Sequence, residues 1–101
     1  SESSEAVQAR VMNARNQQLQ RQGCVNAELQ GEMRDQVCQL SEMDQLWLLN
    51  AIERLNLSAR SYHRLLSVAR TLADLASVEH ISRVHLMEAL GFRALDRYRM
   101  G

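Results

Sequence analysis

Residues 59–76, ARSYHRLLSVARTLADLA, repeat apolar side chains at the spacing of an α-helix, and this repeat constrains the fold most. At about 100° per residue, the segment divides into one apolar side and one polar side. The apolar side holds Tyr62, Leu65, Leu66, Val68, Ala69, Leu72 and Ala73. The polar side holds Arg60, His63, Arg64, Ser67, Thr71 and Asp74, with Arg70 at the boundary. With Ser58 as its N-cap, the segment predicts a helix that packs one side on a core and leaves the other in solvent.

The rest of the chain is also predicted to be helical, because it contains no proline and only four glycines. Ser3 or Ser4 caps a first helix over 4–22, and Gly23 ends it. The apolar face of this helix is weak, with only Val7, Val11, Ala14 and Leu19. We therefore expect residues 1–23 to be partly docked, or to connect this domain to another one.

Residues 24–101 are expected to form the compact domain. A turn around Asn26 precedes a short helix at about 31–38, and Ser41 caps a helix over 42–56. That helix has a broad apolar surface made of Met43, Leu46, Trp47, Leu49, Ala51, Ile52 and Leu55. Ser82 caps a last helix over 83–91, which Gly91 is expected to end, leaving the tail FRALDRYRMG. The fold class is thus all-α, a small bundle of four to five helices.

Charge argues weakly against a free-standing nucleic-acid-binding module, because twelve acidic residues balance twelve basic ones. All twelve basic residues are arginine, whose planar guanidinium suits bidentate pairing with carboxylate or phosphate. A biased genome composition would produce the same usage, so the arginines alone do not indicate a ligand.

Metal binding is not indicated by the cysteines and histidines. Cys24 and Cys38 form no CxxC pair, and His63, His80 and His85 do not complete a zinc site at ligand spacing. Two buried, reduced thiols in a cytoplasmic protein are the expected state. No run approaches the roughly 20 apolar residues that span a membrane, and the N-terminus lacks a secretory pattern. The absence of an initiator methionine suggests a fragment.

Arg60 occupies the second position of its predicted helix, where a cation lies at the unfavourable, positive end of the helix dipole. The free N–H groups of that first turn, Arg60 and Arg64 together suit an anion such as phosphate. The alternative is an exposed arginine that simply tolerates this position.

Three stretches carry a resemblance to a known family: RQGCVNAEL at 21–29, LNLSARSYHRLLSVARTLADL at 55–75, and HISRVHLMEALGFRALDR at 80–97. They are similar to the C-terminal domain of magnesium-chelatase-like AAA+ ATPases, and the similarity covers nearly the whole chain. In such ATPases a nucleotide-binding core is followed by a helical lid, and ATP lies between the two, usually at a subunit boundary of a ring.

The resemblance implies that Arg60 is the sensor 2 arginine, which reaches the γ-phosphate and couples nucleotide state to lid angle. Arg64 matches the family pattern without an assigned role. The first helix carries the pattern AR-x-x-Q-x-x-R, and Arg15 or Arg21 could contact nucleotide across a subunit boundary, although a solvated linker helix is the default. Catalytic residues are not expected in this chain alone, since it has no lysine and hence no GxxxxGK[ST] phosphate loop.

ATP and Mg²⁺ are therefore expected as cofactors of a longer parent protein rather than of this chain. The expected partners are an upstream AAA+ core, neighbouring subunits of a homo-oligomeric ring such as a hexamer, and DNA. Three functions stay open. The first is the lid of a motor that drives DNA branch migration or helicase activity in natural transformation and recombination. The second is the lid of a magnesium-chelatase subunit that inserts Mg²⁺ into a porphyrin, and the third is a stand-alone helical interaction module.

Overall fold

The computed structural model describes the backbone of residues 2–100 and the side chains of residues 2–92. Its elements in chain order are α1 (Ser4–Gln22), the 3-10 turn η1 (Asn26–Glu28), α2 (Gly31–Val37), α3 (Glu42–Arg54), α4 (Ala59–Leu75) and α5 (Arg83–Met100). The part of the chain that the structure describes contains no strand, so the predicted all-α fold is confirmed. None of its helices is long and apolar enough to cross a membrane.

Serine caps start three of the helices at the predicted positions. The Oγ atoms of Ser3, Ser41 and Ser58 accept hydrogen bonds from the backbone N–H groups three residues further on. These bonds satisfy donors that the first turn of a helix leaves unpaired. Gly23 ends α1 in the left-handed conformation with φ of 79°, which glycine adopts without steric cost.

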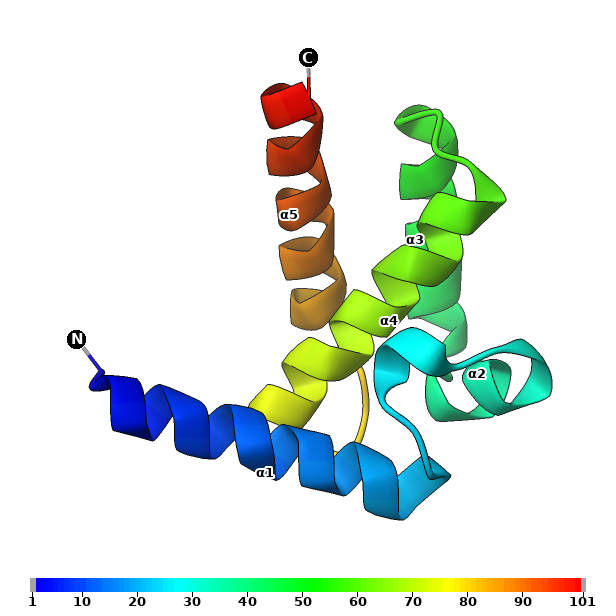
Figure 1. The fold of residues 1–101 in the computed structure, drawn as a ribbon. Helices are drawn as coiled ribbons and strands as arrows, with labels where there is room; N and C mark the ends of the chain where they lie inside the picture. Colours follow the sequence, from blue (N-terminus) through cyan, green and yellow to red (C-terminus); the bar gives the residue numbers. More distant parts are fainter. Residues whose placement is uncertain (1, 101) are drawn as a thin grey trace.

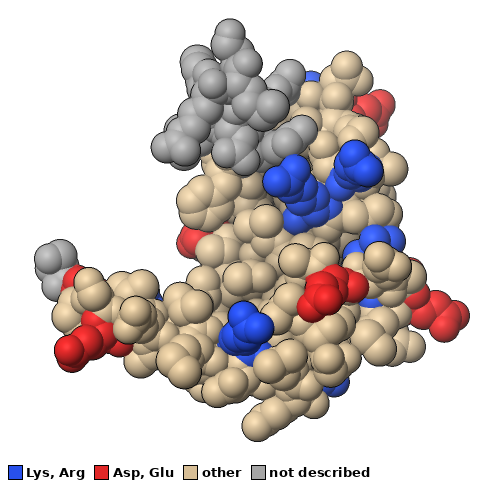
Figure 2. Space-filling model, viewed as in Figure 1, with Lys and Arg blue, Asp and Glu red and all other residues tan. Residues whose placement is uncertain are grey.

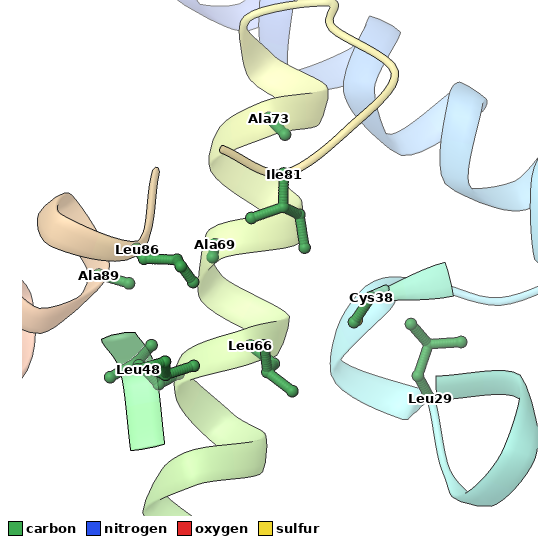
Figure 3. Close-up of a cluster of buried hydrophobic side chains, with 10 residues drawn as sticks. Leu29, Cys38, Leu48, Leu66, Ala69, Ala73, Ile81, Leu86 and Ala89 are labelled. Carbon is green, nitrogen blue, oxygen red and sulfur yellow. The ribbon is translucent and has the colours of Figure 1, made fainter. Parts of the chain in front are cut away.

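Helix α4 lies at the centre of the fold, between α5, α1 and η1 (Figure 1). Its buried aliphatic side chains are Leu65, Leu66, Ala69 and Ala73, as the sequence periodicity predicts. Figure 3 shows Leu48, Leu86 and Ala89 approaching α4 on one side and Leu29 and Cys38 on the other. The core is therefore a layer of small and branched aliphatic groups around one helix.

Helix α3 buries a narrower face than its sequence suggests. Leu48 is fully buried, whereas Met43, Leu46, Leu49 and Leu55 are exposed. The half-buried Trp47 and Ile52 also pack against the core, so α3 contacts it along the side that holds these residues and Leu48. Its start is also tied to the start of α5: Arg83 Nε lies 2.8 Å from Asp44 Oδ1, and its guanidinium lies 4.9 Å from the centre of the Trp47 ring.

Helix α5 does not end at Gly91, and the predicted tail is helical to Met100. A glycine inside a helix costs about 1 kcal/mol relative to alanine. The residues on both sides of Gly91 are mostly good helix formers, and this modest cost does not stop the helix. The start of α5 differs from the other starts, because His85 Nδ1 accepts a hydrogen bond from the backbone N–H of Ser82 at 3.0 Å. In a capping box, a glutamate or glutamine side chain three residues after the capping residue accepts a hydrogen bond from the backbone N–H of that residue. His85 takes this position relative to Ser82.

Candidate functional site

The first turn of α4 presents Arg60 to solvent. Ser58 has extended backbone angles (φ −81°, ψ 168°), and its Oγ accepts from Ser61 N at 3.2 Å, which fixes the direction in which α4 begins. Arg60 is the second residue of the helix and is exposed. Within the described part of the chain, its guanidinium has no hydrogen bond or ion-pair partner. An arginine in this setting keeps all of its donors available to an incoming anion.

Arg64 lies one helical turn beyond Arg60 on the same side of α4 and is also exposed. Figure 2 shows basic side chains gathered on the side of the molecule where the N-terminal half of α4 lies. Residues one turn apart on a helix are surface neighbours, so the two arginines present their charges to the same region. The structure therefore brings together the two site residues that the sequence placed on α4.

A groove with a volume of about 470 Å³ continues from Arg64 along α4. Its walls come from α4, α2 and the segment around η1, and they consist of Ala27, Leu29, Arg34, His63, Arg64, Ser67, Val68, Thr71 and Leu72. The sequence did not predict this groove, because Arg34 on α2 and His63 on α4 are 29 positions apart and no local pattern joins them.

Arg34 and His63 meet at one wall of the groove. Nη2 of Arg34 lies 3.3 Å from Nε2 of His63, and since an arginine only donates, the imidazole accepts through that nitrogen. Arg34 Nε and His63 Nδ1 are buried without a hydrogen-bond partner among the described residues. No described carboxylate forms an ion pair with Arg34, although the residue is half-buried.

Arg21, the second candidate on α1, contacts α4 although it is partly exposed to solvent. Its Nη1 lies 2.9 Å from Asp74 Oδ1, and its Nη2 lies 3.2 Å from Asp74 Oδ2 and 3.1 Å from Asn26 Oδ1. These bonds hold the end of α1 against α4. A contact of Arg21 with nucleotide stays an untested prediction, and it would compete with Asp74. Arg15 is exposed near the middle of α1, and the groove does not include it.

Asp74 and Arg70 are buried, which corrects their expected places on the polar side and at the boundary of α4. Asp74 is 1% exposed and Arg70 is 4% exposed, and Arg70 Nη2 lies 3.0 Å from Asp74 Oδ1. Arg70 also donates to the carbonyl oxygens of Val78 and Glu79 at 3.1 and 2.9 Å. The polar side of α4 is thus covered at its C-terminal end by α1 and by the chain that follows α4.

Burial alone would raise the pKa of Asp74, but the net direction is downward. Hydrogen bonds from Arg21 and Asn26, together with the positive charge of Arg70, hold the pKa of this carboxyl below its ordinary value of 3.8. Asn26 completes the arrangement, since its Nδ2 donates to Asp74 at 2.9 Å and to Thr71 at 3.0 Å. The carboxylate is therefore charged at neutral pH and serves as the polar centre between α1 and α4.

Metal ligands are not gathered anywhere in the described part of the chain, where no cluster of three or more His, Cys, Asp or Glu could hold an ion. Both cysteines are free thiols, with Cys38 buried and Cys24 half-buried. Burial raises the pKa of Cys38 to about 11, which keeps it protonated and unreactive at neutral pH.

Comparison with known proteins finds a matching family. Residues 1–93 match the family model described as magnesium chelatase, subunit ChlI C-terminal. Over 96 residues, 95% of the chain, it is 46% identical to YifB of Escherichia coli strain K12 and 45% identical to YifB of Salmonella typhimurium. It is 42% identical, over the same length, to the competence protein ComM of Haemophilus influenzae. In each case the matched region is 19% of the length of the relative.

Proposed function

The chain belongs to the magnesium chelatase subunit ChlI C-terminal family, and from this premise we propose that it is the nucleotide-sensing lid of an AAA+ ATPase. In this proposal Arg60 is the sensor 2 residue. It contacts the γ-phosphate of an ATP molecule that is held mainly by another domain of a longer parent protein. The chain spans about a fifth of the length of its curated relatives, which leaves ample length in such a parent for an ATPase core.

The observation that carries the proposal is the state of Arg60. It lies in the first turn of a capped helix, is exposed, and lacks a partner among the described residues. A cation at this end of a helix is unfavourable by a few tenths of a kcal/mol unless an anion is added. A bound phosphate would reverse that sign, because the N–H groups of the helix start and the guanidinium would then act on the same charge.

Rotation of the lid would transmit the effect of the phosphate contact from Arg60 to the rest of the domain. Arg60 lies at the start of α4, and Asp74 lies near its end, where Arg21 joins α4 to α1. Because α4 is a continuous helix that packs against α5, α1 and η1, a force applied at Arg60 would move α1 together with it. ATP and its Mg²⁺ are expected to be bound by the assembled parent protein.

DNA branch migration in a homohexameric ring is the motor work that we favour for the parent. One of the relatives is named a competence protein, and this name favours motor work on DNA. The second candidate is insertion of Mg²⁺ into a porphyrin, and the name of the matching family favours it. A branch-migration assay on a forked DNA substrate and a chelatase assay on a porphyrin would separate the two candidates.

The lid assignment is tested by Arg60→Ala in the full-length parent, with ATP hydrolysis measured under saturating ATP and Mg²⁺. We expect a fall of about tenfold or more, because one charge-assisted hydrogen bond to the transferred phosphoryl group is lost. Arg54→Ala is the matched control, since Arg54 is an exposed arginine at the end of α3. Equal ATPase rates for wild type and both variants would rule out the sensor assignment.

A further inference from the structure

We infer that the groove beside Arg64 is a docking site for a short acidic segment of a partner protein that contains both carboxylates and aliphatic side chains. This inference goes beyond the proposed contact of Arg60 with nucleotide, because Arg60 does not line the groove. It rests on three properties of the groove: its aliphatic floor, its unpaired cations and the residue types that it lacks.

The floor of the groove is aliphatic. Leu29 comes from the segment between η1 and α2, and Val68 and Leu72 lie one turn apart on α4. Val68 and Leu72 are only half-buried, so they retain apolar surface that a partner side chain could cover. Covering such surface removes apolar groups from water, which favours the entry of aliphatic side chains.

The walls of the groove carry uncompensated positive charge. Arg34 is half-buried, its contact with His63 is a bond to a neutral acceptor, and no described carboxylate pairs with it. Arg64 faces solvent without an ion-pair partner among the described residues. None of the described residues that line the groove is acidic. A carboxylate brought between Arg34 and Arg64 would therefore meet two guanidinium groups and no repulsive charge.

The residue types along the groove favour a peptide over single-stranded nucleic acid. Sites for single-stranded nucleic acid combine positive charge with aromatic side chains on which the bases stack. The only ring among the described lining residues is the half-buried imidazole of His63, and one of its nitrogens is occupied by Arg34. Ser67 and Thr71 also line the groove, and their hydroxyl groups already donate to the carbonyl oxygens of Asn26 and Ser67 at 3.5 and 3.0 Å.

The test uses the 101-residue chain and a fluorescein-labelled peptide of sequence GDELLELLDG, with binding followed by fluorescence anisotropy. We expect saturable binding that weakens at least tenfold in Arg64→Glu and in Arg34→Gln. Arg54→Glu is the matched control and should leave the affinity unchanged within twofold, since Arg54 is exposed but does not line the groove. Arg64 is exposed, so its variant should fold, and circular dichroism of both variants would confirm that they do.

Two further probes identify what the groove recognises. A peptide in which serine replaces each leucine, and one in which lysine replaces each acid, should both bind at least tenfold more weakly. An unlabelled oligothymidine of equal length should not compete with the labelled peptide. Competition by the oligonucleotide, equal weakening by Arg54→Glu, or absence of saturable peptide binding would each overturn the inference. Arg60→Ala should keep full peptide affinity, so this inference and the proposed nucleotide contact can fail independently.

Discussion

Replacing Asp74 by asparagine should destabilise the fold strongly while leaving its shape nearly unchanged. In the native protein the carboxylate receives two hydrogen bonds from Arg21, one from Asn26, and an ion pair from Arg70. Asparagine has one acceptor oxygen and turns an NH₂ group toward these donors. Arg70, which is 4% exposed, would lose its counter-charge.

The size of the effect follows from the burial of this pair. Breaking a buried ion pair by removing one partner costs about 3–5 kcal/mol. Arg70 keeps its bonds to the carbonyl oxygens of Val78 and Glu79, and Arg21 is partly exposed, so the low end is appropriate. A loss of about 3 kcal/mol in the free energy of unfolding corresponds to a fall of roughly 12–24 °C in Tm for a domain of this size.

The assay is thermal and urea unfolding followed by far-ultraviolet circular dichroism, with Asp35→Asn as the control. Asp35 is an exposed carboxylate on α2, so its variant should stay within about 0.5 kcal/mol of wild type. Equal stabilities of the Asp74 and Asp35 variants would refute the account of the α1–α4 contact.

The same comparison has a predictable dependence on pH. Because the pKa of Asp74 is lower in the folded chain than its ordinary value of 3.8, its stabilising contribution is fully present above that value. The contribution is lost as pH falls from 3.8 through the lower folded pKa. The stability difference between wild type and Asp74→Asn should therefore be smaller at about pH 3 than at about pH 7. A difference that is the same at both pH values would contradict the direction of the shift.

Three further substitutions or reactions test other parts of the structure. Leu48→Ala removes a fully buried side chain and should lower the free energy of unfolding by about 2–5 kcal/mol. Leu46→Ala, at a position that is 63% exposed, should change it by no more than about 0.5 kcal/mol. Similar losses for the two variants in urea unfolding would contradict the orientation of α3. Gly91→Ala should raise the free energy of unfolding by about 0.5–1 kcal/mol, because α5 continues through this position and a Cβ there meets no atom within 4 Å. A variant that is less stable than wild type would contradict the continuous helix. Iodoacetamide at about pH 8 should modify Cys24 before Cys38, because burial raises the pKa of Cys38 to about 11. Peptide mass mapping measures the two rates of modification, and equal rates would count against the burial of Cys38.

Helix boundaries were predicted well because their signals are local. Each capping serine acts on an N–H group three residues away, so Ser3, Ser41 and Ser58 mark helix starts in the sequence itself. The prediction that Gly91 ends α5 was wrong, because the residue type alone does not fix the backbone conformation. A glycine ends a helix only where the chain turns into the left-handed region, as Gly23 does, and Gly91 stays in helical conformation.

Burial of polar residues could not be predicted in the same way. The periodicity of α4 identifies its aliphatic face, but Asp74 is covered by Arg21, which is 53 positions away. In the sequence, a polar helix face that is exposed cannot be distinguished from one that a neighbouring helix buries, because both show the same pattern of polar residues. The groove has the same origin, since Arg34 and His63 come together only through the packing of α2 on α4.

The central claim, that Arg60 reads the γ-phosphate, is tested most directly by comparing ATP and ADP affinities of the full-length parent and its Arg60→Ala variant. A charge-assisted hydrogen bond is worth about 1.5–3 kcal/mol, so loss of the contact should weaken binding of a non-hydrolysable ATP analogue roughly 10- to 150-fold. ADP lacks the γ-phosphate, and its affinity should change less than twofold. Equal weakening of both nucleotides, or no change in either, would contradict the account.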